Sequence, residues 1–309
     1  MVNKITIVGY GSQAKTWASN LKESGVDITI VLRKNSSSIK VAHNDDMRVL
    51  ETPLDKPRNL GRYIVVLTPD HTHEEIIQNL RPFTEEGSTF IFAHGYSQIK
   101  HNFKEKFPHM NFTLLAPKAI ASEMRDLYKQ SKTFPGAISV EHSSRPKDDK
   151  QFLLLLAKKL GMTIPTEVTF EEETICDLFS EQSLLCSLLP YGIRYAFEAL
   201  RNRNISSEMA FNECLFESKL IIQTLEKVGF ERFFEIISPN ALIGGEKAKN
   251  SSQFQGLNVL FEKLLDDISS RKFYEEVDKS NVSELRQKVL SDWKNSEVTH
   301  EWKRQHNKN

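Results

Sequence analysis

The sequence is poor in cysteine and contains no long apolar run. Its three cysteines, Cys176, Cys186 and Cys214, lack the CxxC spacing of zinc and redox sites and do not suggest a disulfide framework. Because they fall inside apolar helical stretches, we expect them to be small core residues in a reducing compartment. No segment approaches the apolar length of a membrane-spanning helix, and residues 1–11 are typical of a strand and turn, not of a signal peptide. We therefore expect a cytoplasmic protein without a membrane partner.

The sequence also lacks an excess of charge of either sign. Lys and Arg number 41, and Asp and Glu number 41, which gives a formal net charge of +0 at pH 7. Nucleic acids and anionic membranes are bound by a concentrated positive field, so neither is expected as the main partner. Apolar residues make up 39% of the chain, enough to bury a core, and a length of 309 residues predicts one large or two moderate domains.

The first half alternates short β-branched runs with amphipathic stretches. Helical patterns such as residues 13–23 and 73–80 lie between the runs, and Gly25 and Gly87 stand where helices give way to strands. This alternation predicts an α/β fold of the Rossmann type, with a parallel sheet covered by helices on both faces. The predicted strands are residues 4–8, 27–32, 63–67, 89–92, 113–115 and 137–140.

From about Thr169 the pattern changes, because no further β-rich run follows and apolar residues recur at helical spacing. Pro165 marks the predicted boundary, so we expect a dinucleotide-binding domain over residues 1–168 and an all-α domain over residues 169–309. The polar tail after Asp292 is predicted to be a solvated, frayed end. The predicted helices are residues 171–189, 193–201, 206–228, 256–270 and 282–293.

The first predicted strand leads into a glycine-rich turn. Residues 9–14 read GYGSQA and match the GxGxxA pattern, with a strand before and a helix after. Gly9 permits the tight turn, Gly11 lets the backbone approach a pyrophosphate, and Ala14 lets the helix pack closely against the strand. The helix N-terminus presents free N–H groups to an anion. A glycine turn without a ligand is the alternative, but this context favours dinucleotide binding.

The end of the second predicted strand indicates which dinucleotide is bound. NAD enzymes usually place Asp or Glu there to bond to the ribose 2′-OH. Here residues 33–38 read RKNSSS, with two cations, three hydroxyls and no acid. These groups suit a 2′-phosphate through charge-assisted hydrogen bonds, so NADP is preferred to NAD. A solvated polar loop is the alternative.

Polar residues also follow later strands. Asp70 comes after the third predicted strand, His94 after the fourth and Lys118 after the fifth. In open α/β sheets, ligands lie beyond the carboxyl ends of the strands, so His94 and Lys118 are candidate catalytic residues. A purely structural role is the alternative for His94.

Two predicted helices each carry a pair of acids four residues apart, Asp177 with Glu181 and Glu213 with Glu217. This spacing puts both acids of a pair on one helix face. Apolar residues flank both faces, so we expect the acids to be buried, which is costly unless they are paired. A divalent cation that prefers oxygen ligands, such as magnesium, would offset that cost. Exposure at a rim is one alternative, and the others are ion pairs with Arg194, Arg201 or Lys219.

In their order along the chain, these motifs resemble those of ketol-acid reductoisomerase, the acetohydroxy-acid isomeroreductase of branched-chain amino acid synthesis, in its short form. The resemblance covers nearly the whole chain, and its pair of acidic motifs, DLFxEQ and ExxxE, is specific. The matching segments are GYGSQA, the LR…SSS loop, LTPD, AHG, APK, DLFSEQ and NECLFESKLI.

The resemblance implies roles for these residues. His94 matches the active-site histidine, and Ser238 matches the serine that contacts substrate. Asp177 and Glu181 would bind two Mg²⁺ ions together with Glu213 and Glu217, which reach the site from a second subunit and so imply at least a dimer. The residues implied to bind NADP(H) are Tyr10, Gly11, Ser12, Gln13, Arg33, Ser36, Ser38, Asp70 and His73.

The implied reaction has two steps on a small acetohydroxy acid of the 2-acetolactate type. Magnesium ions polarise the substrate's oxygens and support migration of an alkyl group. NADPH then delivers hydride to the resulting ketone and yields the dihydroxy acid.

Two loops depart from the family pattern. Lys118 is followed by Ala119, Ile120 and Ala121, where the family has Gly-Pro-Gly, and Ser238 is followed by PNAL, where the family has Asn-Thr-Ala-Glu. These changes around retained carboxylates leave two alternatives open. One is a diverged NADP-linked reductase of another 2-keto or 2-hydroxy acid that does not isomerise it. The other is a non-catalytic homologue.

Overall fold

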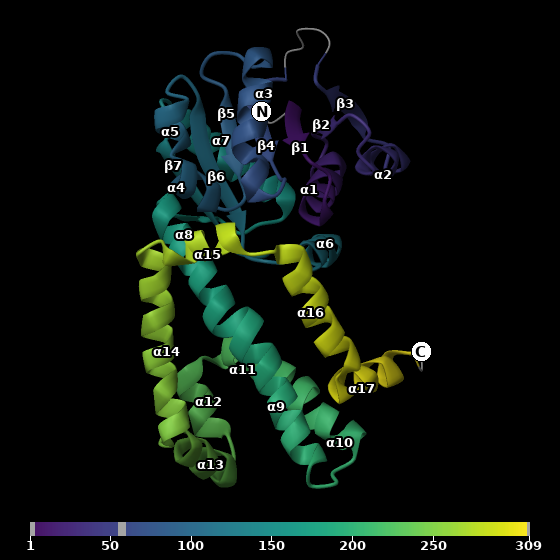
Figure 1. The fold of residues 1–309 in the computed structure, drawn as a ribbon, viewed down its shortest axis with the longest axis vertical. Coiled ribbons are helices and arrows are strands. Elements are labelled where there is room, and N and C mark those ends of the chain that lie inside the picture. Colours follow the sequence, from purple (N-terminus) through teal and green to yellow (C-terminus); the bar gives the residue numbers. More distant parts are fainter. Residues whose placement is uncertain (1–3, 55–59, 308–309) are drawn as a thin grey trace. The chain divides into compact units, whose positions relative to one another are not determined.

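The computed structural model describes residues 4–54 and 60–307, and the chain divides into two compact units. The first unit is Met1–Thr174 and contains the strands, whereas the second is Ile175–Asn309 and is helical where it is described (Figure 1). No helix among the described residues is both long enough and apolar enough to cross a membrane.

One eight-stranded sheet forms the centre of the first unit. Its strands are β1 (Lys4–Val8), β2 (Asp27–Arg33), β3 (Arg48–Thr52), β4 (Tyr63–Val66), β5 (Thr89–Phe92), β6 (Asn111–Pro117), β7 (Gly136–His142) and β8 (Thr166–Glu167). They lie in the order β3-β2-β1-β4-β5-β6-β7-β8, and all neighbours are parallel except β6 and β7. The six predicted strands are confirmed, and β3 and β8 were not predicted. The strand order reverses between β1 and β4, which is where such sheets open a ligand crevice.

Helices cover both faces of this sheet, as predicted. Successive side chains of a strand point to opposite faces, so Phe90 and Phe92 join one buried cluster and Ile91 joins the other. α1 packs with α6 and α7 on the face of Ile91, and α3 contributes Ile77 to the other cluster. The helices of this unit are α1 (Ser12–Glu23), α2 (Ser38–Asn44), α3 (His73–Leu80), α4 (Tyr96–His101), α5 (Phe103–Lys106), α6 (Ala121–Lys129) and α7 (Pro146–Leu160), with short 3₁₀ turns η1 (Asp70–Thr72) and η2 (Arg81–Phe83).

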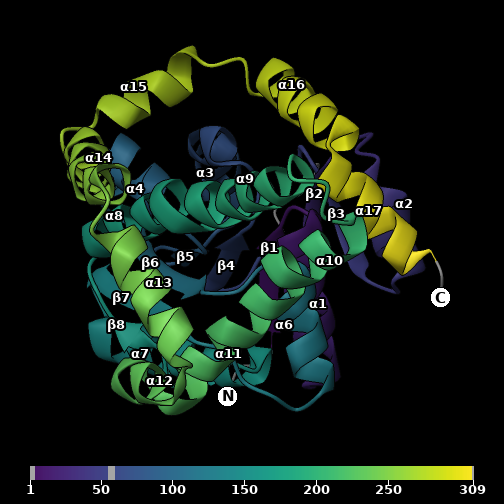
Figure 2. The same ribbon diagram turned by 90° about the horizontal axis from the view of Figure 1, so that it is seen from below.

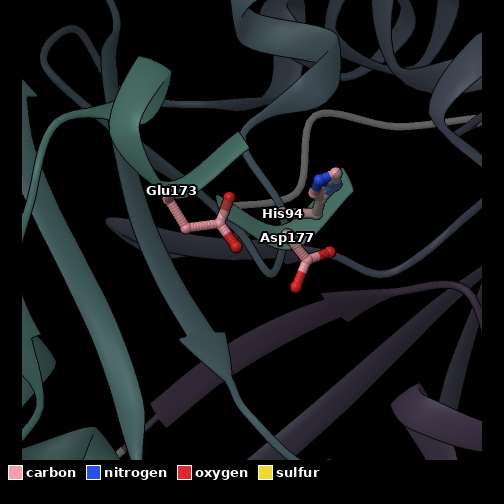
Figure 3. Close-up of side chains that lie close together, drawn as sticks. All are labelled: His94, Glu173 and Asp177. Carbon is pink, nitrogen blue, oxygen red and sulfur yellow. The ribbon is translucent and has the colours of Figure 1, made fainter. Parts of the chain in front are cut away.

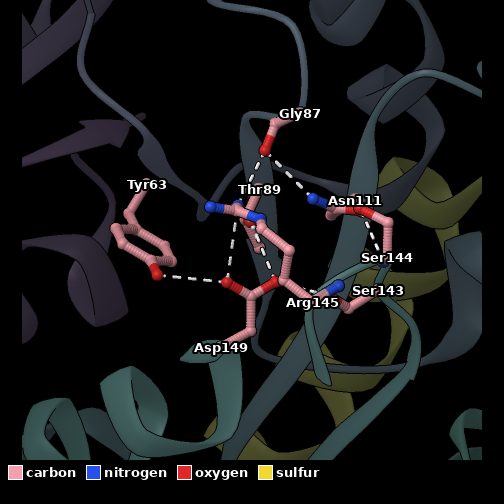
Figure 4. A network of polar contacts seen from close by, with 8 residues as sticks. All are labelled: Tyr63, Gly87, Thr89, Asn111, Ser143, Ser144, Arg145 and Asp149. Carbon is pink, nitrogen blue, oxygen red and sulfur yellow. Dashed lines mark hydrogen bonds and ion pairs between the residues drawn. The ribbon is translucent and has the colours of Figure 1, made fainter. Parts of the chain in front are cut away.

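A polar network closes the amino edge of the sheet (Figure 4). The fully buried carboxylate of Asp149 accepts hydrogen bonds from Tyr63 (3.1 Å), Thr89 (3.1 Å) and Ser143 (2.6 Å). The Arg145 guanidinium lies 3.6 Å from the same carboxylate. Because Tyr63 and Thr89 are the first residues of β4 and β5, this carboxylate ties α7 to the sheet at the edge opposite the crevice.

The second unit contains helices and two π-helical segments. The helix α8 begins in the first unit and runs on into the second without a break. The predicted helical character of this half is confirmed. Its elements are α8 (Phe170–Ser180), the π-helical η3 (Glu181–Leu188), α9 (Leu189–Arg201), α10 (Ser207–Phe211), the π-helical η4 (Asn212–Glu217), α11 (Ser218–Val228), α12 (Phe230–Ile236), α13 (Pro239–Lys249), α14 (Ser252–Ser269), α15 (Lys272–Lys279), α16 (Val282–Asn295) and α17 (Glu297–His306).

The end of the chain is a packed helix, so the prediction of a frayed tail after Asp292 is wrong. α17 lies beside α10 (Figure 2), and the Ser207 hydroxyl donates to Glu301 at 2.8 Å. Val298 joins Phe197, Ala210 and Phe211 in a small buried cluster. The packing of α17 therefore rests on two buried side chains, Val298 and Glu301, within an otherwise polar segment.

Apolar side chains of the second unit are mostly exposed in the single chain. Of the 28 large apolar side chains that are exposed among the described residues, 24 lie in this unit. Cys176 and Cys186 are also exposed and Cys214 is only partly buried, so the prediction that they are core residues is wrong. The helices have the predicted apolar faces, but the single chain does not bury these faces.

Candidate active site

The turn after β1 has the geometry that a dinucleotide requires. Gly9 has φ +98°, and a Cβ there would lie 2.7 Å from the Leu67 carbonyl oxygen, so only glycine fits. At Gly11 a Cβ would meet no atom within 4 Å, which leaves the backbone open to a ligand. Ala14 is fully buried where α1 crosses the sheet. Each small residue of the motif thus has a steric reason.

A cleft of about 370 Å³ lies beyond the carboxyl ends of β1, β2 and β4. It brings together five of the residues expected to bind the cofactor, namely Tyr10, Gly11, Arg33, Ser36 and Ser38. Ser12 and Gln13 begin α1 next to the turn. The lining continues with Val8, Gly9, Val31, Leu32, Thr52, Leu67, Thr68, Pro69, His71, Thr72, Glu75, Ile76, Asn79 and Leu80.

The side-chain hydroxyl of Tyr10 is engaged within the protein and does not serve to bind an anion. Its hydroxyl donates to Asp45 Oδ2 at 2.9 Å, and Lys15 Nζ lies 3.0 Å from the same oxygen. Burial, together with the hydrogen bond to Asp45, raises the pKa of Tyr10 far above its usual value. Tyr10 therefore anchors the turn to the end of α2.

The structure separates His73 from the cleft wall. His71 and Thr72 line the cleft, whereas Asp70 and His73 are not among its lining residues. His73 is 4% exposed, and both ring nitrogens are engaged, Nδ1 with Ser97 Oγ (2.7 Å) and Nε2 with the Thr68 carbonyl oxygen (2.8 Å). Burial lowers the pKa of His73. The predicted direct contact of His73 with the dinucleotide therefore does not follow from its placement.

Lys118 and the segment after His94 meet at a buried carboxylate. Lys118 Nζ donates to Glu173 Oε1 at 2.7 Å, and the Gly95 N–H donates to Glu173 Oε2 at 2.8 Å. The Glu173 side chain is 1% exposed. A Cβ at Gly95 would lie 2.6 Å from the Phe170 carbonyl oxygen, so glycine is required where α8 crosses. The buried charge of Glu173 is thus balanced by an ammonium group and a backbone donor.

Glu173 also lies close to two of the predicted site residues (Figure 3). One ligand atom from each of His94, Glu173 and Asp177 lies within 4.8 Å of the other two. Glu173 and Asp177 are one turn apart on the unbroken helix α8. Sequence reasoning missed Glu173 because it ends a run of three glutamates, which is typical of a solvated first helical turn. Its spacing of four residues before Asp177 was the available signal.

The other three acids lie on π-helical segments. Glu181 begins η3, and Glu213 and Glu217 lie in η4. All three are exposed, so the prediction that the chain buries these faces is wrong for the single chain. A hydrogen bond from Glu213 to Glu217 raises the pKa of Glu213. Single π-helical turns occur frequently at functional sites, and both acidic motifs have one.

Two of the three predicted alternative partners of these acids are engaged elsewhere. Arg194 binds Glu198 and Asp292, and Arg201 binds Glu297. Within the described part of the chain, the cluster of His94, Glu173 and Asp177 does not include Glu181, Glu213 or Glu217. All three of these acids are exposed in the single chain.

The two divergent loops both start helices. Ser238 is the N-cap of α13, where its Oγ accepts a hydrogen bond from the Ala241 N–H at 3.2 Å. α6 begins at Ala121, and the preceding Ile120 is 70% exposed. Thr16 donates to the Ala121 carbonyl oxygen at 3.1 Å, which joins this loop to α1.

Comparison with known proteins gives matches along both units. Residues 2–164 match the family described as acetohydroxy acid isomeroreductase, NADPH-binding domain. Residues 170–308 match ketol-acid reductoisomerase, C-terminal domain. A ketol-acid reductoisomerase (NADP(+)) from Methanothermobacter thermautotrophicus is 33% identical over 276 residues, which are 88% of this chain and 83% of that protein. One from Sulfolobus acidocaldarius is 31% identical over 277 residues, 88% and 82% of the two chains.

Solved structures give the same picture. An NADH-preferring ketol-acid reductoisomerase from an uncultured archaeon has a TM-score of 0.79 at 27% identity and covers 96% of this chain and 92% of its own. A pyrroline-5-carboxylate reductase from Coxiella burnetii has a TM-score of 0.64 at 14% identity, covering 88% and 97% of the two chains, which is a likeness of fold alone.

Proposed function

The chain belongs to the ketol-acid reductoisomerase family, and on that premise we propose that it converts a 2-acetolactate-type acid into the dihydroxy acid with NADPH and magnesium. The observation that carries the proposal is the buried Glu173, which binds Lys118 at 2.7 Å and lies beside His94 and Asp177. This cluster follows β5 and β6, at the same edge of the sheet as the dinucleotide cleft.

In this proposal the first unit binds NADPH. The N-terminus of α1 and the open backbone at Gly11 receive the pyrophosphate. Arg33, Ser36 and Ser38 line the cleft at the end of β2, where a guanidinium and two hydroxyls suit a 2′-phosphate. The absence of an acid there removes the group that would bond to an unmodified ribose.

The donor set of the acidic segments fits magnesium, which prefers carboxylate oxygens and keeps some of its waters. Asp177 and Glu181, four residues apart, would hold it together with Glu213 and Glu217. When bound, magnesium supplies Lewis acidity at adjacent substrate oxygens, and NADPH supplies the hydride. Glu173 fixes the Lys118 ammonium near these oxygens, where its positive charge stabilises the negative charge that develops during alkyl migration. His94 and Ser238 would orient the substrate.

We propose that the site is shared between two copies of the chain. Glu213 and Glu217 are exposed on η4, next to exposed apolar side chains such as Phe216 and Leu220, and they do not join the cluster of Asp177 within one chain. A second copy would cover these apolar faces and bring its acids to Asp177 and Glu181.

Co-expression of Glu181→Gln with Glu213→Gln tests this sharing. Each variant alone has no intact site, whereas a hybrid dimer has one intact site of two, so random pairing restores about a quarter of the activity. Activity should recover only when both variants are expressed in the same cell. If the mixture stays as inactive as its components, the two acids belong to the same chain's site.

The loop over residues 119–121 favours one second candidate, a reductase that no longer isomerises. Ile120 is 70% exposed where the family has a tight Gly-Pro-Gly loop, and a different loop shape here would alter the approach to the cofactor. Oxidation of NADPH by the migrated keto acid, without oxidation by acetolactate, would support this candidate.

The decisive assay is NADPH consumption with acetolactate, with and without magnesium. We expect turnover that requires the metal. Binding of neither NADPH nor magnesium would instead support a non-catalytic homologue, and turnover that is equal without any divalent cation would contradict the assignment of the carboxylates.

A further inference from the structure

His73 is a buried histidine to which the proposed chemistry gives no role. It is the first residue of α3, and its ring stacks on Phe92 of β5 with a centroid distance of 5.2 Å. Because it is only 4% exposed, its ring is not accessible to a molecule bound in the cleft. Its two ring nitrogens nevertheless contact two different segments of the site.

The contacts of the ring fix its tautomer. The Thr68 carbonyl oxygen can only accept, so Nε2 of His73 carries the hydrogen and donates at 2.8 Å. Nδ1 of the neutral ring then accepts from the Ser97 hydroxyl at 2.7 Å. The Asp70 carboxylate lies 3.8 Å from Nδ1, too far for a hydrogen bond. The imidazole therefore has one donor and one acceptor, each with its own partner.

These two partners belong to the two halves of the site in the first unit. Thr68 lines the dinucleotide cleft, and its methyl group is packed against the turn at Gly9. Ser97 is fully buried in the first turn of α4, three residues after His94. His73 is thus the bridge between the loop after β4 and the loop after β5.

We propose that His73 is a positioning residue that sets the cofactor wall at Thr68 and the His94 segment in their relative places. The role rests on the proposed function. The hydrogen bond to Thr68 would hold the cofactor side, and the bond from Ser97 would hold the substrate side. The two bonds should therefore be separable by mutation.

Two amide variants of His73 remove the two hydrogen bonds one at a time. An asparagine amide reaches the position of Nδ1, so His73→Asn keeps a partner for Ser97 and loses Thr68. A glutamine amide reaches the position of Nε2, so His73→Gln keeps the donor to Thr68 and loses Ser97. Ser97→Ala removes the substrate-side bond alone. Ser139→Ala, an equally buried serine in β7, is the matched control.

Two measurements should respond differently. For His73→Asn, fluorescence titration without metal should show NADPH binding weakened about tenfold, while kcat at saturating NADPH changes less than about threefold. For His73→Gln and Ser97→Ala, NADPH binding should stay within about threefold while kcat falls about tenfold. Ser139→Ala should change neither.

Equal changes of both quantities in the two amide variants would overturn the proposal, as would no change in either. A general loss of folding moves binding and kcat together and so counts against it. If the unmodified protein turns over no acetohydroxy acid, the proposed function fails, but the NADPH titration still decides whether His73 holds the cofactor wall.

Discussion

The two units of this chain use acidic and apolar side chains in opposite ways. In the first unit, Asp149 and Glu173 are buried and accept three and two hydrogen bonds, and apolar clusters cover both faces of the sheet. In the second, seven apolar residues are buried among those described, while 24 large ones are exposed together with Glu181, Glu213 and Glu217.

This difference indicates that the buried carboxylates stabilise the fold, whereas the exposed ones serve the chemistry. A buried carboxylate with a full set of donors holds a fold together, and its removal leaves those donors unpaired. An exposed carboxylate contributes little to folding, and its oxygens are ligands of the kind that magnesium prefers. We therefore expect removal of the buried Asp149 carboxylate to act mainly on stability, and changes in the exposed acidic segments of the second unit to act mainly on catalysis.

The largest expected effect is that of Glu181→Gln. Removing one carboxylate charge from the proposed magnesium site should lower the rate of isomerisation on the order of 10³-fold, because the Lewis acid supplies several kcal/mol there. The melting temperature should hardly change, since Glu181 is exposed. Steady-state assays with acetolactate and a thermal melt check both parts. Glu226→Gln, an exposed acid on α11, serves as the control, and substantial isomerisation in the Glu181 variant would rule out the metal assignment.

Asp149→Asn should produce the opposite pattern. The amide cannot accept from Tyr63, Thr89 and Ser143 as a carboxylate does, and it leaves Arg145 without its counter-ion. We expect a loss of about 3 kcal/mol in the free energy of unfolding, with kcat unchanged at temperatures where the protein is folded. Urea unfolding measures this loss. The neighbouring exposed Asp148→Asn should cost far less, and similar losses for both would show that the network does not stabilise the sheet edge.

Arg33→Glu addresses the cofactor alone. Reversing the charge at the predicted 2′-phosphate position should weaken NADPH binding about 30-fold and NADH binding less than about threefold. Magnesium affinity should be unchanged. Titration of both dinucleotides measures the ratio, with the exposed Lys147→Glu on α7 as a control for net charge. Equal weakening of both dinucleotides would mean that the loop does not read the 2′-phosphate.

Local patterns predicted most of the first unit. The turn at Gly9 and the strands of the sheet could be predicted because each depends on a short segment of sequence. The steric and hydrophobic requirements of these segments are met by residues close to them. β3 was missed because it is a short, half-exposed edge strand whose two apolar residues, Val49 and Leu50, stand between polar ones and show no alternation. The candidate site was predicted in its main residues, but Glu173 depends on α8 crossing Gly95, a contact that joins residues 78 positions apart.

Burial in the second unit was predicted less well, and the reason is physical. Helical periodicity shows which side of a helix is apolar, but not what covers it. The acids and cysteines were therefore expected in a core that the single chain does not form. The end of the chain was predicted to be frayed because its sequence is polar overall. One buried valine and one paired glutamate are nevertheless enough to hold α17 in place.

That paired glutamate is the exception in the second unit and carries the smallest expected effect. Glu301 is 4% exposed and accepts hydrogen bonds from Arg304, Gln305 and Ser207. Its bonds to Arg304 lower its pKa from 4.5 to about 2, so the carboxylate stabilises the folded state at neutral pH. Arg304 is 41% exposed, which screens the pair, so we expect Glu301→Gln to cost about 1–2 kcal/mol at pH 7.

The pH dependence distinguishes this pair from a packing effect. Because the folded-state pKa is the lower one, the contribution is complete above about pH 4.5 and is lost as the pH falls towards 2. The difference in unfolding free energy between Glu301→Gln and the unmodified protein should therefore shrink over that window. The exposed Glu275→Gln should show a small difference throughout. A Glu301 difference that stays constant from pH 7 to pH 3 would mean that side-chain shape, not charge, holds α17 against α10.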